Sequence, residues 1–142
     1  MFPFGQYESP KICDRENLRL ISEVLRSSNA KLLTADYQEI MKDAEKDDFV
    51  FLDPPYQPTS QTANFTGYTN SGFSIEDQER LGNWFRELDR RGCYLLLCNS
   101  DTPEVCRIYE GYSPLRVKAL RAINCKGNGR KGHTELIISN RE

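Results

Sequence analysis

The chain has 142 residues, of which 38% are hydrophobic and 28% charged, and its formal net charge is −2. This length and composition predict one soluble globular domain with a hydrophobic core and exclude a membrane-spanning segment or a signal peptide. The five cysteines are scattered and accompanied by a single histidine, a pattern that predicts a reduced cytoplasmic protein without a metal site.

The first third of the chain is predicted to form two helices and two short strands. Apolar residues recur at helical spacing after Asp14, which can cap a helix that continues to residue 27. Residues 31–35 (KLLTA) predict a strand, and a brief helix is expected from there to about Glu45. Residues 49–52 (FVFL) are entirely apolar, which predicts a strand buried on both faces of a parallel sheet.

The rest of the chain alternates between helix and strand signals after a long polar loop at residues 54–72, and loops of this length are usually functional or disordered. A helix is expected between Ser74 and Gly92. Ser74 is its N-cap candidate, with Asp77 and Gln78 placed to form the reciprocal capping hydrogen bond, and Gly92 is expected to end it. A strand, a short helix and an antiparallel pair of strands are expected at residues 93–100, 102–111, 115–123 and 134–139. The order predicts an open α/β fold, with a mostly parallel sheet whose terminal hairpin strand is reversed.

The turn after residues 49–52 carries the clearest chemical signal. Asp53 follows a predicted strand at the edge where open α/β sheets bind ligands. Pro54 and Pro55 have no backbone N–H, so the Pro54 carbonyl is expected to be available to a ligand. With the ring of Tyr56 nearby, two acceptors and one aromatic face suit a planar ring with an exocyclic amino group. The alternative is an ordinary proline-rich turn, expected by chance in roughly one chain in 200.

Three other patterns are ambiguous or are rejected. Asp36 ends the predicted strand at residues 31–35, where it can cap the following helix or contact a ligand, and the residues alone favour the cap. Residues 111–134 contain basic side chains and no acid, which is typical of a solvated hairpin or of a phosphate-contacting edge. The G-x-G-x-x-G match at residues 127–132 precedes a predicted strand rather than a helix, so we interpret it as a hairpin turn.

Residues 53–81 (DPPYQPTSQTANFTGYTNSGFSIEDQERL) resemble the catalytic motif of the Dam-type DNA adenine-N6 methyltransferases, the D12 class. The likeness extends to the strand end at Cys98–Asp101 and to the closing basic hairpin. It implies a partial Rossmann-like methyltransferase fold that transfers a methyl group from S-adenosylmethionine to adenine N6 in double-stranded DNA, with GATC as the expected site. The role would be restriction–modification or housekeeping methylation.

The resemblance also implies roles for individual residues. Asp53, Pro54 and Tyr56 would hold an adenine flipped out of the duplex and stabilise the charge that develops on its amino nitrogen. Asp36 and Tyr37, together with Asp53, would contact the cofactor. The residues that would face the DNA or the target base are Pro3, Pro55, Asn64, Tyr68, Phe73, Lys126, Asn128, Arg130 and Lys131.

The F-x-G-x-G turn of the family's methyl-donor site has no counterpart in this sequence. The chain therefore resembles a carboxyl-terminal half, with residues 1–12 ending a target-recognition segment and residues 13–142 completing the catalytic domain. Such a half is expected to expose a sheet edge and to be inactive or weak alone. The alternative is a non-catalytic DNA-binding remnant, or a subunit that needs an N-terminal half in trans. A cytosine or glutamine acceptor is disfavoured by the acid before Pro-Pro.

Overall fold

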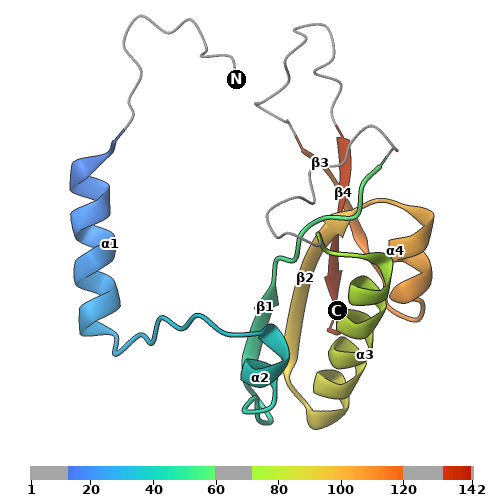
Figure 1. Cartoon of the computed structure of the whole chain (residues 1–142), viewed down its shortest axis with the longest axis horizontal. Coiled ribbons are helices and arrows are strands. Elements are labelled where there is room, and N and C mark those ends of the chain that lie inside the picture. The colour runs from blue at the N-terminus through green and yellow to red at the C-terminus, as the bar shows by residue number, and fades with distance from the viewer. Residues whose placement is uncertain (1–12, 60–71, 120–132, 142) are drawn as a thin grey trace, which may run out of the picture. The chain divides into compact units, whose positions relative to one another are not determined.

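The computed structural model describes residues 13–59, 72–119 and 133–141 (Figure 1). The chain divides into two compact units, Met1–Ala35 and Asp36–Glu142. None of the helices in the described ranges is both long and apolar enough to cross a membrane.

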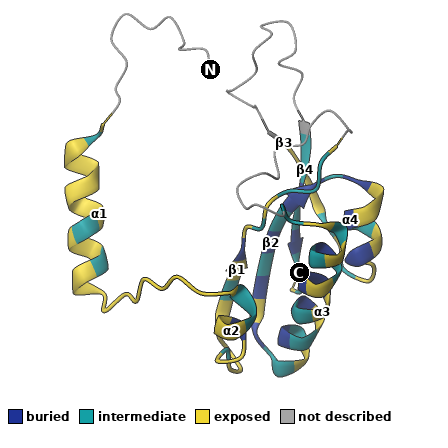
Figure 2. Ribbon diagram, in the orientation of Figure 1, coloured by how far each residue is buried: buried dark blue, intermediate teal, exposed yellow. Residues whose placement is uncertain are grey.

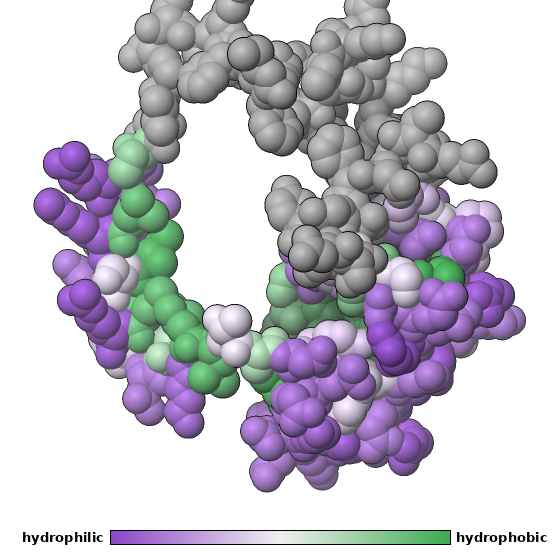
Figure 3. Space-filling view, in the orientation of Figure 1, coloured by the Kyte–Doolittle hydropathy of each residue, from purple (hydrophilic) through white to green (hydrophobic). Residues whose placement is uncertain are grey.

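The first unit contains helix α1, Arg15–Ser27. As expected, Asp14 caps it, accepting a hydrogen bond from the Asn17 amide at 3.2 Å. An apolar stripe along α1 remains exposed (Figure 3); its members are Leu18, Leu20, Ile21 and Val24.

The strand expected at residues 31–35 does not form, which corrects that prediction. This segment has no regular structure, and Leu32 is 80% exposed. A strand needs hydrogen-bonding neighbours, and no strand in the described ranges pairs with these residues.

The second unit is built on a four-stranded sheet in the order β1-β2-β4-β3. The strands are β1 (Phe49–Leu52), β2 (Tyr94–Ser100), β3 (Leu115–Ala119) and β4 (His133–Ser139). β1 and β2 are parallel, whereas β4 is antiparallel to both β2 and β3. The reversed terminal strand is therefore as expected, but a mostly parallel sheet is not confirmed, because only the β1–β2 pair is parallel among the described strands.

Three helices accompany the sheet in this unit. Helix α3 (Ile75–Arg91) is the crossover between the parallel strands β1 and β2, and it contacts α4 (Pro103–Ile108) and the short helix α2 (Tyr37–Met41). Helix α2 ends at Met41, earlier than the end at about Glu45 that the sequence predicted. The core lies between α3, α4 and one sheet face, with Phe85, Leu97 and Ile138 fully buried (Figure 2).

The opposite face of the sheet is not covered by the other described elements of this unit. Phe49 and Phe51 are 66% and 53% exposed, and Tyr94, the register partner of Phe49, is exposed too. The prediction that residues 49–52 are buried on both faces of the sheet was therefore wrong. Side chains alternate along a strand, so only Val50 and Leu52 join or pack against the core. Among the described strands β1 lies at an open edge, as expected, and the sheet face beside it is apolar.

The start of α3 determines what its first turn presents to the end of β1. Ser74 and Asp77 form a reciprocal capping box: the Asp77 amide donates to Ser74 Oγ at 3.2 Å, and the Ser74 amide donates to Asp77 Oδ2 at 2.8 Å. Gln78 takes no part in this box, contrary to expectation, and turns into the protein. Gly92 ends the helix with a φ of +88°, as its sequence position predicted.

Candidate functional site at the end of strand β1

The Asp53–Tyr56 turn begins where β1 ends. Because β1 and β2 are parallel, it lies at the sheet edge where Asn99 and Ser100 end β2. Asp53 and Pro55 are exposed, and Pro54 and Tyr56 are half-buried. The sequence therefore placed this turn correctly at the ligand-binding edge of the parallel pair.

A hollow of about 300 Å³ opens beside the turn. Its walls come from α2, the end of β1, the turn and α3, and its lining residues are Tyr37, Met41, Phe51, Leu52, Asp53, Pro54, Pro55, Phe73 and Leu81. The rings of Tyr37 and Phe73 lie 6.5 Å apart and are inclined at 59°. Asp53 supplies the one carboxylate of this lining. Such a hollow suits a planar, largely apolar ring with a polar edge.

Tyr56 faces a different neighbourhood. It does not belong to the lining of the hollow, and its hydroxyl forms a hydrogen bond with the Cys98 thiol of β2. Burial raises the pKa of Tyr56, and the negative charge of Asp53 raises it further. Burial also raises the pKa of Cys98, again with a contribution from Asp53. Asp53 thus borders the hollow and also acts electrostatically on the tyrosine, which stays neutral.

Asp36 caps α2, with its Oδ1 accepting from the Gln38 amide at 2.9 Å. The capping interpretation is therefore confirmed, and Asp36 is not part of the hollow's lining. Its neighbour Tyr37 does line the hollow. Burial raises the pKa of Tyr37, and the positive charge of Arg80 opposes that shift. Of the residues expected to contact the cofactor, the structure brings Tyr37 and Asp53 together.

Phe73 and Pro55 were expected on the side of the substrate, and both line the hollow with Tyr37. The other predicted DNA-facing residues lie outside the described residues; they are Pro3, Asn64, Tyr68, Lys126, Asn128, Arg130 and Lys131. In the part of the chain that the structure describes, no group of histidine, cysteine, aspartate and glutamate side chains is arranged to hold a metal ion.

Two buried amides behind the turn were not assigned a functional role from the sequence. Gln78 Nε2 donates to the Pro55 carbonyl at 2.8 Å, and Asn99 Oδ1 accepts from the Gln57 amide at 3.0 Å. The two side chains bond to each other at 3.0 Å. Both residues lie in segments that carry the family resemblance, Gln78 in residues 53–81 and Asn99 in Cys98–Asp101, but their contacts join residues far apart in the chain.

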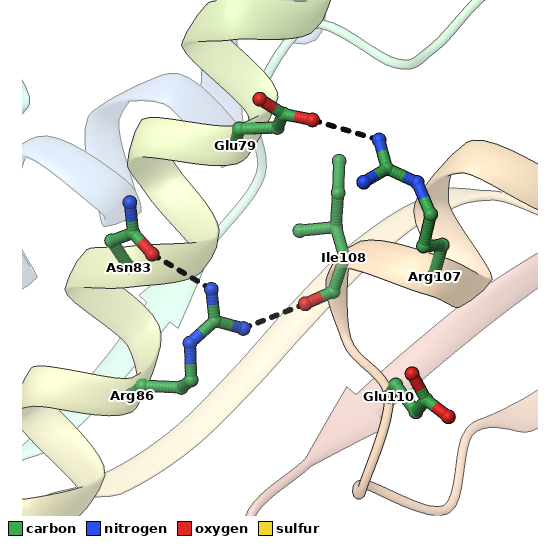
Figure 4. Close-up of a pocket in the computed structure, with 6 residues that line it drawn as sticks. All are labelled: Glu79, Asn83, Arg86, Arg107, Ile108 and Glu110. Carbon is green, nitrogen blue, oxygen red and sulfur yellow. Dashed lines mark hydrogen bonds and ion pairs between the residues drawn. The ribbon is translucent and has the colours of Figure 1, made fainter.

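A larger hollow, of about 440 Å³, lies between α3 and α4 (Figure 4). Most of its polar side chains are already paired: Arg107 pairs with Glu79 at 2.7 Å, and Arg86 donates to Asn83 and to the Ile108 carbonyl. None of its lining residues belongs to a strand or to the Asp53–Tyr56 turn. We therefore favour the smaller, apolar hollow at Asp53 as the site, despite its size.

Comparison with known proteins identifies relatives that match nearly the whole chain. "Type II methyltransferase M1.LlaDCHI" of Lactococcus lactis subsp. cremoris is 40% identical over 138 residues, which are 97% of this chain and 49% of that protein. "Type II methyltransferase M.MjaIII" of Methanocaldococcus jannaschii is 42% identical over 97% of this chain and 48% of its own. The "DNA adenine methylase" of Vibrio cholerae is 37% identical, with coverages of 95% and 48%.

The chain thus spans about half the length of the curated relatives it matches. The sequence model of one family, described as D12 class N6 adenine-specific DNA methyltransferase, matches residues 1–123. This match covers most of the chain and includes the whole Asp53–Tyr56 turn and the hollow beside it. The chain belongs to the D12 class of N6 adenine-specific DNA methyltransferases.

Proposed function

We propose that this chain carries the catalytic turn of an enzyme that transfers a methyl group from S-adenosylmethionine to adenine N6 in double-stranded DNA. The observation that carries the proposal is the position of Asp53, which borders a ring-sized apolar hollow on one side and acts on Tyr56 on the other. Membership of the family supports the reaction, and the two type II relatives support a role in restriction–modification.

The hollow fits the adenosyl end of the cofactor by the chemistry of its lining. The aromatic side chain of Tyr37 can contact a purine ring, and the Asp53 carboxylate can accept hydrogen bonds from polar hydrogens at the mouth of the hollow. When bound, S-adenosylmethionine would supply an electrophilic methyl group. Asp36, one residue before the hollow's wall, would reach the cofactor with the carboxylate oxygen that does not cap α2.

The residues of the turn would act on the target adenine. Asp53 and the Pro54 carbonyl would accept the two hydrogens of the amino group, which keeps the nitrogen lone pair available and stabilises the developing positive charge. The Pro55 carbonyl already accepts a hydrogen bond from Gln78, whereas none of the described hydrogen bonds ends on the Pro54 carbonyl. Tyr56 would stack on the base, which must leave the duplex to arrive there.

The finer assignments rest on the resemblance to Dam-type enzymes. We propose GATC as the methylated site, with residues 1–12 ending a target-recognition segment. Pro3, Asn64, Tyr68 and the basic Lys126–Lys131 segment would then contact the DNA, and Pro55 and Phe73 would flank the base or its pocket. Lysines and arginines on phosphates would make this binding weaken steeply with salt.

A second candidate function is that of a part which works only with a separate N-terminal half. One observation favours it: a face of the sheet carries exposed aromatic side chains, Phe49, Phe51 and Tyr94. We propose that this chain alone transfers methyl groups weakly or not at all. A DNA-binding remnant without catalysis would bind DNA but not the cofactor.

The test compares the chain with and without an N-terminal half supplied from a full-length relative. Calorimetry would measure binding of S-adenosylmethionine, and radiolabelled cofactor would measure methyl transfer to GATC-containing and scrambled duplexes. With both halves present, Asp53→Ala is expected to lower methyl transfer about 100- to 1000-fold, the usual cost of removing a group that stabilises developing charge.

Glu110→Gln is the matched control, because Glu110 is an exposed acid beside the α3–α4 hollow, away from the proposed site. It is expected to leave both binding and transfer unchanged. Full activity of Asp53→Ala would refute the catalytic assignment. Efficient transfer by the unaccompanied chain would refute the need for another half.

A further inference from the structure

The Asp53–Tyr56 turn has little capacity to hold its own shape through backbone hydrogen bonds. Pro54 and Pro55 have no N–H, so half of the turn's amide donors are missing. The turn also lies at a surface-exposed strand end, where β1 has stopped pairing with β2. The two proline rings fix φ at their own positions, so it is the peptide units around Tyr56 that need partner groups from elsewhere in the fold.

Two fully buried amide side chains supply those groups. Gln78, in the first turn of α3, and Asn99, near the end of β2, are both 0% exposed. Burying a primary amide is unfavourable unless its polar atoms are hydrogen-bonded. Here the Gln78 Nε2 atom donates to the Pro55 carbonyl at 2.8 Å, and Asn99 Oδ1 accepts from the Gln57 amide at 3.0 Å.

These two backbone groups flank one residue, Tyr56. The Pro55 carbonyl belongs to the peptide unit before Tyr56, and the Gln57 N–H belongs to the unit after it. Fixing both peptide planes fixes the direction in which the Tyr56 side chain leaves the backbone. The two amides therefore control the orientation of the ring that the proposed function assigns to the target base.

The direction of the hydrogen bonds is set by chemistry. A carbonyl can only accept and a backbone N–H can only donate. Asn99 Oδ1 must therefore face the Gln57 amide, and it also accepts from the Ser100 amide at 2.9 Å. This leaves Asn99 Nδ2 to donate to Gln78 Oε1 at 3.0 Å, which turns Gln78 Nε2 towards Pro55. The chain of bonds has one consistent orientation.

We infer that Gln78 and Asn99 are positioning residues that clamp the peptide units on both sides of Tyr56 and so aim its ring at the extruded adenine. This inference rests on the proposed function, since a clamp matters to catalysis only if the turn receives the base. Neither residue would touch substrate or cofactor. Their effect would pass through the backbone of the turn.

The first test asks whether the clamp exists, and it needs no activity. Hydrogen exchange followed by NMR would compare the Gln57 amide with core amides such as those of Leu97 and Ile138. Gln78→Met keeps the side chain's size and removes its hydrogen bonds. Asn99 then loses the acceptor that orients its side chain, so exchange at Gln57 is expected to become about tenfold faster relative to the core, in line with loss of the hydrogen bond from Gln57 to Asn99.

Asn140→Leu is the matched control. Asn140 is also an amide that ties strand to helix, donating to Asp89 and to the Cys93 carbonyl, but at the opposite end of β2. It is expected to lower overall stability without a selective effect on Gln57. If Gln57 exchange in Gln78→Met changes only as much as the core does, as in the control, the clamp is refuted.

The second test asks whether the clamp serves the base, using the chain with a supplied N-terminal half. Gln78→Glu keeps the acceptor for Asn99 but points a carboxylate at the Pro55 carbonyl. At about pH 8 the charged form repels that carbonyl, whereas at about pH 5.5 a buried carboxyl, whose pKa burial raises, is protonated and can donate. Single-turnover methyl transfer relative to wild type is expected to fall about tenfold or more at the higher pH and to recover at the lower.

Gln78→Met, which can donate at neither pH, is expected to stay defective at both. An equal deficit of Gln78→Glu at both pH values, or transfer at the wild-type rate in Gln78→Met, would overturn the positioning role. If the wild type itself transfers no methyl group, the proposed function fails instead. Hydrogen exchange at Gln57 then still decides whether the two amides clamp the turn.

Discussion

Gly82 illustrates how one residue fixes the packing of two helices. It is buried in α3, and a Cβ atom at this position would overlap Cγ2 of Ile108 in α4. Ile108 is itself buried and has little room to move. A glycine inside a helix normally costs about 1 kcal/mol relative to alanine, so its presence here is explained by the closeness of α4.

Gly82→Ala is therefore expected to destabilise the protein, against the usual helix trend. Overpacking costs about 1–3 kcal/mol, which exceeds the gain in helix propensity. Urea unfolding would measure the change. Leucine has no branch at Cβ, so Ile108→Leu removes the clashing methyl group, and Gly82→Ala should cost less in that background. A more stable Gly82→Ala single variant would contradict the packing argument.

The candidate site shows at residue level what the sequence can and cannot predict. Asp53 was placed correctly because a strand end followed by Pro-Pro is a local signal. The roles of Gln78 and Asn99 were not predicted, because they depend on which side of α3 meets a turn 23 residues earlier in the chain. Tyr56 was expected to share one pocket with Asp53, but its position depends on the contact with Cys98 in β2.

At the scale of elements, α3 was predicted almost residue for residue, because its start and stop signals are local. The capping box of Ser74 and Asp77 and the left-handed Gly92 both lie within the helix's own sequence. The segment at residues 31–35 was mispredicted as a strand because strand formation needs a partner. Its apolar residues favour a strand, but in the described fold no neighbouring strand pairs with them.

The capping box predicts a pH dependence for α3. Asp77 accepts a hydrogen bond from the Ser74 amide, and this bond holds the pKa of the Asp77 carboxyl below its usual value. Because the folded pKa is the lower one, the bond's contribution is complete above about pH 4 and is lost as the pH falls through the folded pKa. Asp77→Ala is expected to cost about 1 kcal/mol at pH 7 and progressively less below pH 4.

Ser74→Ala supplies the contrast, measured by the same urea titrations. It removes the Ser74 hydroxyl acceptor for the Asp77 amide and leaves the bond to the backbone amide in place. Its cost of about 1 kcal/mol should vary less with pH, since Asp77 keeps the bond from the Ser74 backbone amide, which is the largest cause of its lowered pKa. A cost of Asp77→Ala that stays constant down to pH 2 would show that the carboxylate does not stabilise the helix start.

At the scale of the whole molecule, the described elements of the second unit cover its sheet on one side only. α3 and α4 bury Leu97, Leu136 and Ile138, whereas Phe49, Tyr94 and Leu115 are exposed. β1 is also an edge strand, with β2 as its one partner among the described strands. An uncovered apolar face beside an unpaired edge favours association with another chain or domain.

We therefore expect the chain alone to self-associate in sedimentation velocity experiments as its concentration rises. Phe49→Lys should weaken this association about tenfold or more, because burying a phenylalanine is worth about 1.5–3 kcal/mol and lysine protects a strand edge. Phe49 does not line the hollow at Asp53, so cofactor binding should be unaffected. Ser113→Lys adds the same charge at an exposed loop position and serves as the control. Equal self-association of both variants and the wild type would mean that the uncovered face is not the surface through which the chain associates.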